Sequence, residues 1–189
     1  MNDVHKLLDK INNVYNTKIT ITKIITLSKK IKYAYDFDGV LHKNVGPMDE
    51  EGQRHPDPQK FNMPFIKIIN QIKEQLKNGH DVYIITAHCE QNYIINFLKF
   101  HGILIPVDHI NTTCKTDKTN TLRKIGINEF YDDSCLRIIE IYINKNKGLL
   151  PNLNKLYLVN PESDSWIEIL KNKNNQTIMA ECGKYYKTS

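Results

Sequence analysis

From residue 31 onward, short apolar segments typical of β-strands alternate with longer segments whose apolar residues recur at helical spacing. The expected strands are Ile31–Phe37, Val82–Thr86, Glu129–Asp132 and Lys155–Val159. The expected helices are Phe61–Lys77, Gln91–Phe100, Lys118–Ile125 and Leu136–Asn144. This alternation predicts a three-layer α/β/α fold, in which a Rossmann-like, doubly wound parallel sheet is covered by helices on both faces.

The length of the chain allows one such domain with short additions at its ends. At 189 residues the chain can bury one sizeable core. We expect that core at residues 31–170, an N-terminal helical extension at 1–30 that packs on it, and a polar C-terminal tail at 171–189. An apolar stripe in Asp3–Tyr15 indicates the helix of the extension, whereas residues 16–30 fit a strand or a helix equally well.

Charge and hydropathy place few limits on partners. The net charge of +5 comes almost wholly from lysine, and it permits a polyanionic partner such as nucleic acid without indicating one. Apolar runs are too short to span a membrane, and the N-terminus lacks the apolar segment of a secretory signal. The four cysteines show no CxxC spacing, so we expect reduced thiols and a cytoplasmic protein. The sequence leaves the oligomeric state open.

Two acidic pairs follow two of the expected strands. Asp36 and Asp38 come after the first strand beside Gly39, and Asp132 and Asp133 close a later one. Because the carboxyl ends of parallel strands share one edge of the sheet, we expect these carboxylates to meet there. Their charges repel unless a cation neutralises them, and oxygen-only ligands select a hard ion such as Mg²⁺. The sequence thus predicts a magnesium site.

Two further residues at the same edge suit a phosphorylated substrate. Thr86 ends a third strand with a hydroxyl donor, and Lys118 begins a helix, from which it can offer a positive charge. Carboxylates, a hydroxyl, a lysine and a cation are the groups that position a phosphoryl group and stabilise the charge that develops on it. The predicted chemistry is therefore phosphoryl transfer.

Four motifs resemble, in order, those of the haloacid dehalogenase (HAD) superfamily of phosphatases. They are Asp36-Phe37-Asp38-Gly39-Val40 after an apolar strand, a strand ending in threonine at Val82–Thr86, Lys118 at a helix start, and the acidic strand end Phe130-Tyr131-Asp132-Asp133. Lys118 matches the family's lysine motif because Leu122 and Gly126 follow it at the family's spacing, and Lys115 is the reserve candidate. The resemblance covers about residues 33–159.

The resemblance implies a magnesium-dependent phosphohydrolase that cleaves phosphomonoesters through an aspartyl-phosphate intermediate. Asp36 would be the nucleophile and Asp38 the acid/base residue. The implied metal ligands are Asp36, the backbone carbonyl of Asp38, Asp133 and Asp132. The implied phosphoryl-binding residues are Thr86, Ala87 and Lys118.

The intervals between the first three motifs are too short for the cap domain that many of these enzymes carry. A capless phosphatase is therefore expected, with the loop at residues 42–60 as a candidate small lid. Capless relatives have open clefts, and several act on large substrates. A polynucleotide 3′-phosphatase, or another phosphatase of macromolecular ends, is thus an alternative to a small-molecule enzyme. A catalytically idle HAD-fold binding module is a further alternative.

Two histidines lie near these motifs. His42 follows the first motif without belonging to it. His88 comes two residues after Thr86, where contact with substrate is an alternative, but we expect it to be solvated or to cap a helix.

Overall fold

The structure is a computed structural model, and it describes residues 30–44, 62–114, 118–160, 163–170 and 180. The compact unit described below begins at Ile31. The predictions for residues 1–29, for loop residues 45–60, for Lys115 and for the tail apart from residue 180 lie outside the described residues.

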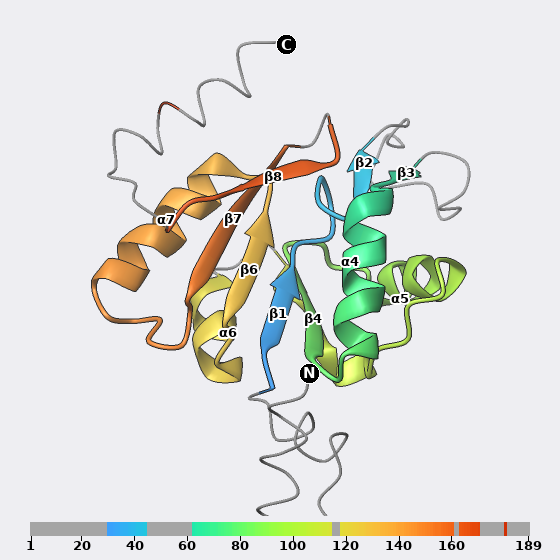
Figure 1. Cartoon of the computed structure of the whole chain (residues 1–189), viewed down its shortest axis with the longest axis horizontal. Helices are drawn as coiled ribbons and strands as arrows, with labels where there is room; N and C mark the ends of the chain where they lie inside the picture. Colours follow the sequence, from blue (N-terminus) through green and yellow to red (C-terminus); the bar gives the residue numbers. More distant parts are fainter. Residues whose placement is uncertain (1–29, 45–61, 115–117, 161–162, 171–179, 181–189) are drawn as a thin grey trace, which may run out of the picture. The chain divides into compact units, whose positions relative to one another are not determined.

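A central sheet organises this unit (Figure 1). Its strands are β1 (Lys32–Tyr35), β4 (Asp81–Thr86), β5 (Ile110–Thr112), β6 (Glu129–Asp132), β7 (Lys155–Asn160) and β8 (Ser165–Glu168). They lie in the order β5-β4-β1-β6-β7-β8. Neighbours pair in parallel except for β7 and β8, which are antiparallel.

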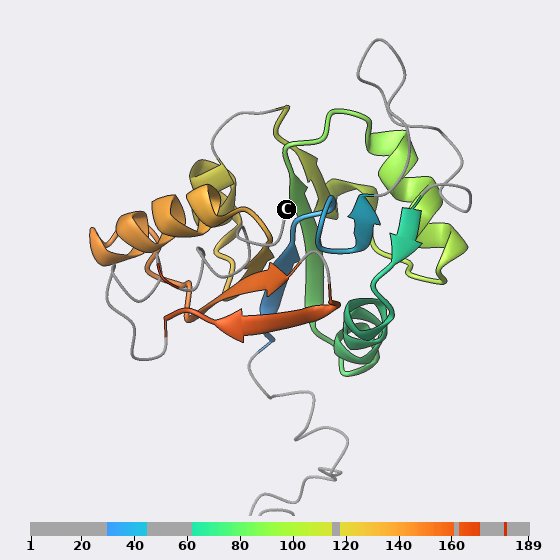
Figure 2. The same ribbon diagram turned by 90° about the horizontal axis from the view of Figure 1, so that it is seen from above.

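Within the described residues, four α-helices cover the sheet, two on each face (Figure 2). They are α4 (Ile66–Lys77), α5 (Gln91–Phe100), α6 (Lys118–Ile125) and α7 (Cys135–Asn146). Successive strand residues point to opposite faces. Tyr35 and Ile84 accordingly share a core with α4 and α5, whereas Ala34 and Ile85 share another with α6 and α7. This arrangement confirms the predicted three-layer fold.

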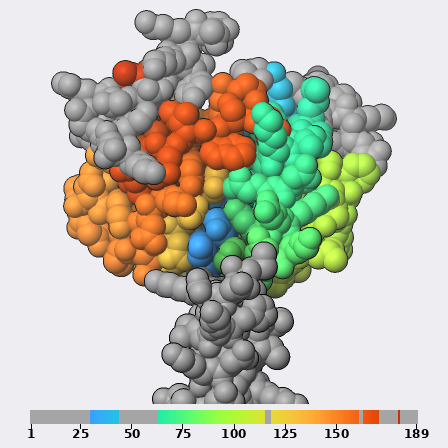
Figure 3. Space-filling model, in the orientation of Figure 1, coloured from blue at the N-terminus to red at the C-terminus, as the bar shows by residue number. Residues whose placement is uncertain are grey.

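Burial explains why the central strands read as continuous apolar runs. β1 lies between β4 and β6, and both of its faces are covered by side chains from the helices. In the space-filling view β1 therefore shows only as a small area (Figure 3).

The predicted helix at Phe61–Lys77 begins later than expected, at Ile66. Residues Asn62–Pro64 form a short strand, β3, which pairs antiparallel with β2 (His42–Asn44). A proline disfavours helical backbone in the residue before it, so Pro64 keeps Met63 extended. The short strands β5 and β8 were also not predicted, since three or four residues show too little periodicity.

The order of the strands places a topological switch point between β1 and β6. After β1 the chain passes through β2 and β3 to α4 on one face, and after β6 it passes to α7 on the other face. β1 and β6 are neighbours. In open α/β sheets the ligand binds at such a switch point, beyond the carboxyl ends of the strands.

Among the described residues no helix is long and apolar enough to cross a membrane. Cys89 and Cys114 are free thiols, but Cys135 is disulfide-bonded, so the expectation of reduced thiols at every cysteine was wrong. Spacing along the chain did not indicate this bond, because a disulfide depends on proximity in space.

Candidate active site

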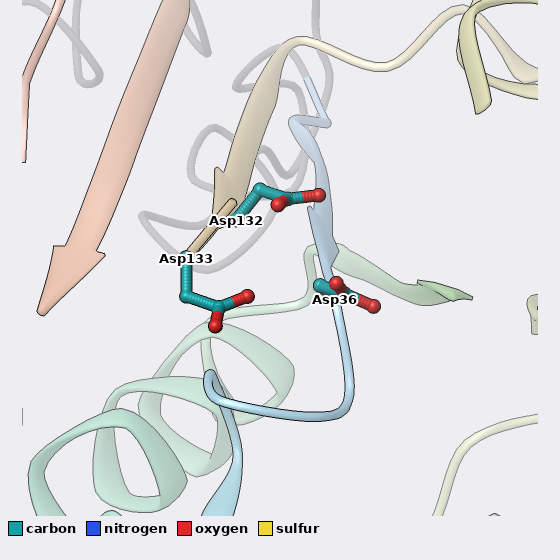
Figure 4. Close-up of side chains that lie close together, drawn as sticks. All are labelled: Asp36, Asp132 and Asp133. Carbon is teal, nitrogen blue, oxygen red and sulfur yellow. The ribbon is translucent and has the colours of Figure 1, made fainter. Parts of the chain in front are cut away.

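Three carboxylates gather at the switch point between β1 and β6. Asp36 directly follows β1, Asp132 is the last residue of β6, and Asp133 comes next. Each offers an oxygen, and these oxygens lie within 4.8 Å of one another. Figure 4 shows the three side chains reaching into the same space from the two strand ends. Asp36 and Asp132 are buried, which makes their mutual repulsion strong.

Lys118 brings a positive charge into this cluster from the first residue of α6. Its Nζ lies 2.7 Å from Asp36 Oδ2 and 2.8 Å from Asp132 Oδ2, although only 2% of the residue is exposed. A buried ammonium is stable only when it is paired. Burial by itself lowers the pKa of Lys118, but Asp132 and Asp36 outweigh this effect and raise it. Lys118 therefore remains charged.

The two residues of the second acidic pair have different surroundings. Asp132 has both oxygens engaged, since Oδ2 accepts from Lys118 Nζ and Oδ1 accepts from the backbone N–H of Ser134 at 2.9 Å. Asp132 thus anchors Lys118. Asp133 instead lies against Gly39, whose φ of +72° suits glycine. A Cβ at Gly39 would overlap the carboxyl of Asp133, so only glycine permits this close approach.

Crowding raises the pKa of two of these carboxyls. Burial, followed by the charge of Asp132, raises the pKa of Asp36 to about 6, although Lys118 opposes the shift. Burial, followed by the charges of Asp132 and Asp36, raises the pKa of Asp133 to about 8. At neutral pH Asp36 is thus mostly ionised, whereas Asp133 mostly keeps its proton unless a cation takes the proton's place.

This donor set fits a hard divalent cation. Lys118 forms ion pairs with Asp36 and Asp132, and its weaker effect on Asp133 does not outweigh burial and the charges of the two neighbouring carboxylates. All the available donors are oxygens, as Mg²⁺ prefers. Asp36 and Asp133 are the residues that would hold such an ion directly, and Asp132 would support them by anchoring Lys118.

The metal-free protein is expected to lose stability from these two groups as the pH rises from about 4 to about 8. The pKa values of Asp36 and Asp133 lie above the ordinary value of 3.8, so the folded state binds more protons than the unfolded chain across this range. Stability falls with rising pH wherever the folded state binds more protons. The measurement is the thermal unfolding midpoint in excess chelator at several pH values.

An Asp133→Asn variant isolates this effect from that of other titrating groups. Its midpoint should depend less steeply on pH than that of the wild type, because its amide does not titrate. Added Mg²⁺ should stabilise the wild type more at about pH 8 than at about pH 5, because binding must displace protons. Identical pH dependence in the wild type and the variant would show that the pKa of Asp133 is not raised in the folded protein.

Thr86 and Ala87 lie at the end of the neighbouring strand β4. Tyr35, the last residue of β1, pairs with Ile84, so Thr86 lies two residues further along, at the carboxyl end of the sheet. Thr86 is buried, and its Oγ1 accepts the backbone N–H of His88 at 3.1 Å, which leaves the hydroxyl hydrogen for another acceptor. Within the described residues no hydrogen bond joins either residue to the acidic cluster.

Asp38 does not belong to the cluster of three carboxylates, and its carboxyl lies close to two histidines. His42 Nε2 lies 3.2 Å from Asp38 Oδ1, and His88 Nδ1 lies 3.5 Å from Asp38 Oδ2. His42 is completely buried, and the side chain of His88 is 12% exposed. The expectation of a solvated or helix-capping His88 was therefore wrong. The folding of the loops after β1 and β4 brings these residues together, and no motif marks them.

The sequence resembles that of a viral protein, and the fold resembles that of a bacterial protein of known structure. No family model matches the chain. It is 36% identical over 201 aligned residues to an uncharacterized protein of Acanthamoeba polyphaga mimivirus, and the match covers 95% of this chain but only 38% of that protein. A solved structure of a Vibrio cholerae protein, described as a 3-deoxy-D-manno-octulosonate 8-phosphate phosphatase, gives a TM-score of 0.41 at 17% identity. That match covers 69% of this chain and 66% of the other, and a likeness at this level defines no function.

Proposed function

We propose that the protein is a magnesium-dependent phosphohydrolase of the HAD type, which cleaves phosphomonoesters through an aspartyl phosphate on Asp36. The observation that carries this proposal is the position of Lys118, whose Nζ contacts both Asp36 and Asp132 within 2.8 Å beside Asp133. A nucleophilic carboxylate, a fixed cation and a cluster of oxygen donors at a switch point suit phosphoryl transfer. The order of the four motifs along the sequence agrees with this reading.

In the first step a carboxylate oxygen of Asp36 forms a bond to phosphorus, while the bond from phosphorus to the leaving oxygen breaks. Asp36 is held for this attack, since its Oδ1 accepts the backbone N–H of Phe37 at 2.7 Å and its Oδ2 accepts from Lys118. The raised pKa of about 6 makes Asp36 more basic than an ordinary aspartate while leaving it mostly ionised at neutral pH. Asp38 would give its proton to the leaving oxygen.

In the second step Asp38 would accept a proton from water as the water oxygen bonds to phosphorus. The bond between phosphorus and Asp36 then breaks, and inorganic phosphate and the free carboxylate are restored. Lys118 and the hydroxyl of Thr86 would bind the phosphoryl oxygens in both steps, together with the backbone at Ala87. Magnesium held by Asp36, Asp133 and the Asp38 carbonyl would neutralise charge on the phosphoryl oxygens.

The proposal includes the absence of a cap domain. Between Thr86 and Lys118 the described residues form α5 and β5, which belong to the layered core, and the short exposed helix Val107–His109. This supports a capless enzyme for that interval. The other interval includes residues 45–61, which lie outside the described residues.

Hydrolysis of a generic aryl phosphate is expected to require a divalent cation. Excess chelator should abolish turnover, and added Mg²⁺ should restore it, because three crowded carboxylates repel both one another and the phosphate. The measurement is steady-state release of the aryl alcohol, with Asp133→Asn as the control that should need far more Mg²⁺. Undiminished turnover in chelator would exclude the mechanism.

The substrate class can be assigned by a screen of phosphomonoesters that includes a 3′-phosphorylated oligonucleotide. Preference for the oligonucleotide, with a rate that falls steeply as salt is raised, would assign the protein to polynucleotide ends. Failure of every substrate, despite Mg²⁺ binding, would favour a HAD-fold binding module.

A further inference from the structure

Burying the imidazole ring of His42 costs free energy, because its two nitrogens are removed from water. The residue has no exposed surface, and its ring lies 4.6 Å from that of Phe37 and 5.3 Å from that of Phe97. An apolar side chain would fill this aromatic pocket without the cost of burying two ring nitrogens. Among the described residues no hydrogen bond to Nε2 offsets that cost. Nδ1 faces the backbone carbonyl of Lys43 at 3.3 Å, and Nε2 faces Asp38 Oδ1 at 3.2 Å.

The turn after β1 produces this contact. The backbone N–H of Leu41 donates to the carbonyl of Phe37 at 2.9 Å, and that of Gly39 donates to the carbonyl of His42 at 3.1 Å. These bonds fold the chain back so that His42, four residues after Asp38, faces its side chain. The same turn contains Gly39, which lies against Asp133, so this turn borders both His42 and the acidic cluster.

His88, in the loop after β4, lies close to the other carboxyl oxygen of Asp38. Its backbone N–H donates to Thr86 Oγ1, and its ring packs near Tyr93 and Phe37 at centroid distances of 5.5 and 6.0 Å. Its Nδ1 lies 3.5 Å from Asp38 Oδ2. The two histidines therefore face different oxygens of one carboxyl, one from the loop after β1 and the other from the loop after β4.

We propose that His42 and His88 are positioning residues that hold the carboxyl of Asp38 between them in the orientation needed for proton transfer. The inference rests on the proposed function, in which Asp38 is the acid/base residue. His42 Nε2 and Asp38 Oδ1 face each other at 3.2 Å without the geometry of a hydrogen bond, so a small reorientation of either side chain would be needed to join them. A separation of 3.2 to 3.5 Å is loose for a hydrogen bond, and such contacts tighten when substrate binds. Misplacing a reacting group slows chemistry far more than it weakens binding.

A His42→Phe variant tests this, because it keeps an aromatic ring in the pocket and removes both nitrogens. With an alkyl phosphate, whose leaving group needs a proton, kcat should fall about 10- to 100-fold while KM changes little. With an activated aryl phosphate the first step should be nearly normal and the second slow, so phosphorylated protein should accumulate. Intact mass measurement after rapid quench detects the added phosphoryl group.

A double-mutant cycle separates positioning from packing. In an Asp38→Asn background His42→Phe should cause no further loss of kcat, because the group it positions is already gone. The matched control is His109→Phe, since His109 also stacks on an aromatic ring, that of Tyr83 at 4.0 Å, but contacts the carbonyl of Val82 and not Asp38. His109→Phe should leave both rates unchanged.

Independent losses from His42→Phe and Asp38→Asn would assign His42 to packing and overturn the proposal. If His42→Phe does not fold, as its thermal unfolding would reveal, the same cycle is run with His88→Asn, which should be coupled to Asp38→Asn in the same way. A wild-type protein that forms no phosphoryl-enzyme would overturn the proposed function and this inference together. Normal wild-type turnover with uncoupled variants would overturn this inference alone.

Discussion

An Asp36→Asn variant is expected to lose all measurable turnover of phosphomonoesters, whereas Asp38→Asn should retain part of the first chemical step. The amide in Asp36→Asn cannot form an aspartyl phosphate, so neither step can occur. Asp38→Asn leaves the nucleophile, Lys118 and the backbone carbonyl of residue 38 in place. It removes the proton donor of the first step and the base of the second, which typically costs a factor of about 10² to 10⁴.

The leaving group should determine how much of the first step survives in Asp38→Asn. An activated aryl phosphate needs little protonation as it leaves, so phosphorylation of Asp36 should continue while hydrolysis of the intermediate is slow. Rapid quench followed by intact mass measurement should therefore find one added phosphoryl group on Asp38→Asn and none on Asp36→Asn. Thermal unfolding should show that both variants are folded. A phosphorylated Asp36→Asn protein would show that the nucleophile is another residue.

The fold was largely predictable because the strongest sequence signals are also the most buried segments. The helices Gln91–Phe100 and Lys118–Ile125 and the strand Glu129–Asp132 have the predicted bounds, and glycines or polar turns follow them. Predictions failed where pairing with a distant segment decides the structure. The strand Asn62–Pro64 exists because it pairs with His42–Asn44, and no periodicity within either segment records that pairing.

The site was predictable to the extent that it depends on strand ends. Parallel pairing of β1 with β6 brings Asp36 next to Asp132 and Asp133, as the positions of these residues at strand ends indicated. The surroundings of Asp38 were not predictable in this way, because its contact with His42 depends on the turn after β1. The contact with His88 likewise requires the loop after β4 to fold back over the sheet edge. Loop geometry of this kind leaves no residue pattern in a single sequence.

A Lys118→Met variant is expected to lose both activity and stability. Methionine fills similar space but has no charge, so Asp36 and Asp132 lose the ammonium that lies 2.7 and 2.8 Å from them. Removing one partner of a buried ion pair typically costs about 3–5 kcal/mol of unfolding free energy. The loss of unfolding free energy should grow as the pH rises. Without Lys118 only protonation removes the repulsion between the two carboxylates, and fewer protons are bound at higher pH. Denaturant unfolding in chelator at several pH values measures this change.

Turnover should fall in Lys118→Met for two reasons. The transferring phosphoryl group loses a positive charge, and removing a single stabilising group of this kind typically lowers kcat about 10²- to 10³-fold. In addition, Lys118 lowers the pKa of Asp36, so in its absence that pKa should rise above its value of about 6. The acid side of the profile of rate against pH should therefore move to higher pH.

The matched control for Lys118→Met is Lys155→Met. Lys155 also pairs with a carboxylate, Glu129, at 3.0 Å, but its side chain is 45% exposed. Glu129 is buried, but it also accepts from the hydroxyl of Tyr157 at 3.3 Å, and water reaches the lysine end of this pair. This variant should therefore lose less stability than Lys118→Met and stay fully active. Equal losses in the two variants, or an unshifted pH profile in Lys118→Met, would show that Lys118 does not control the charge of Asp36. The contrast follows from burial, since the same ion pair is far more costly to break where water cannot replace the missing partner.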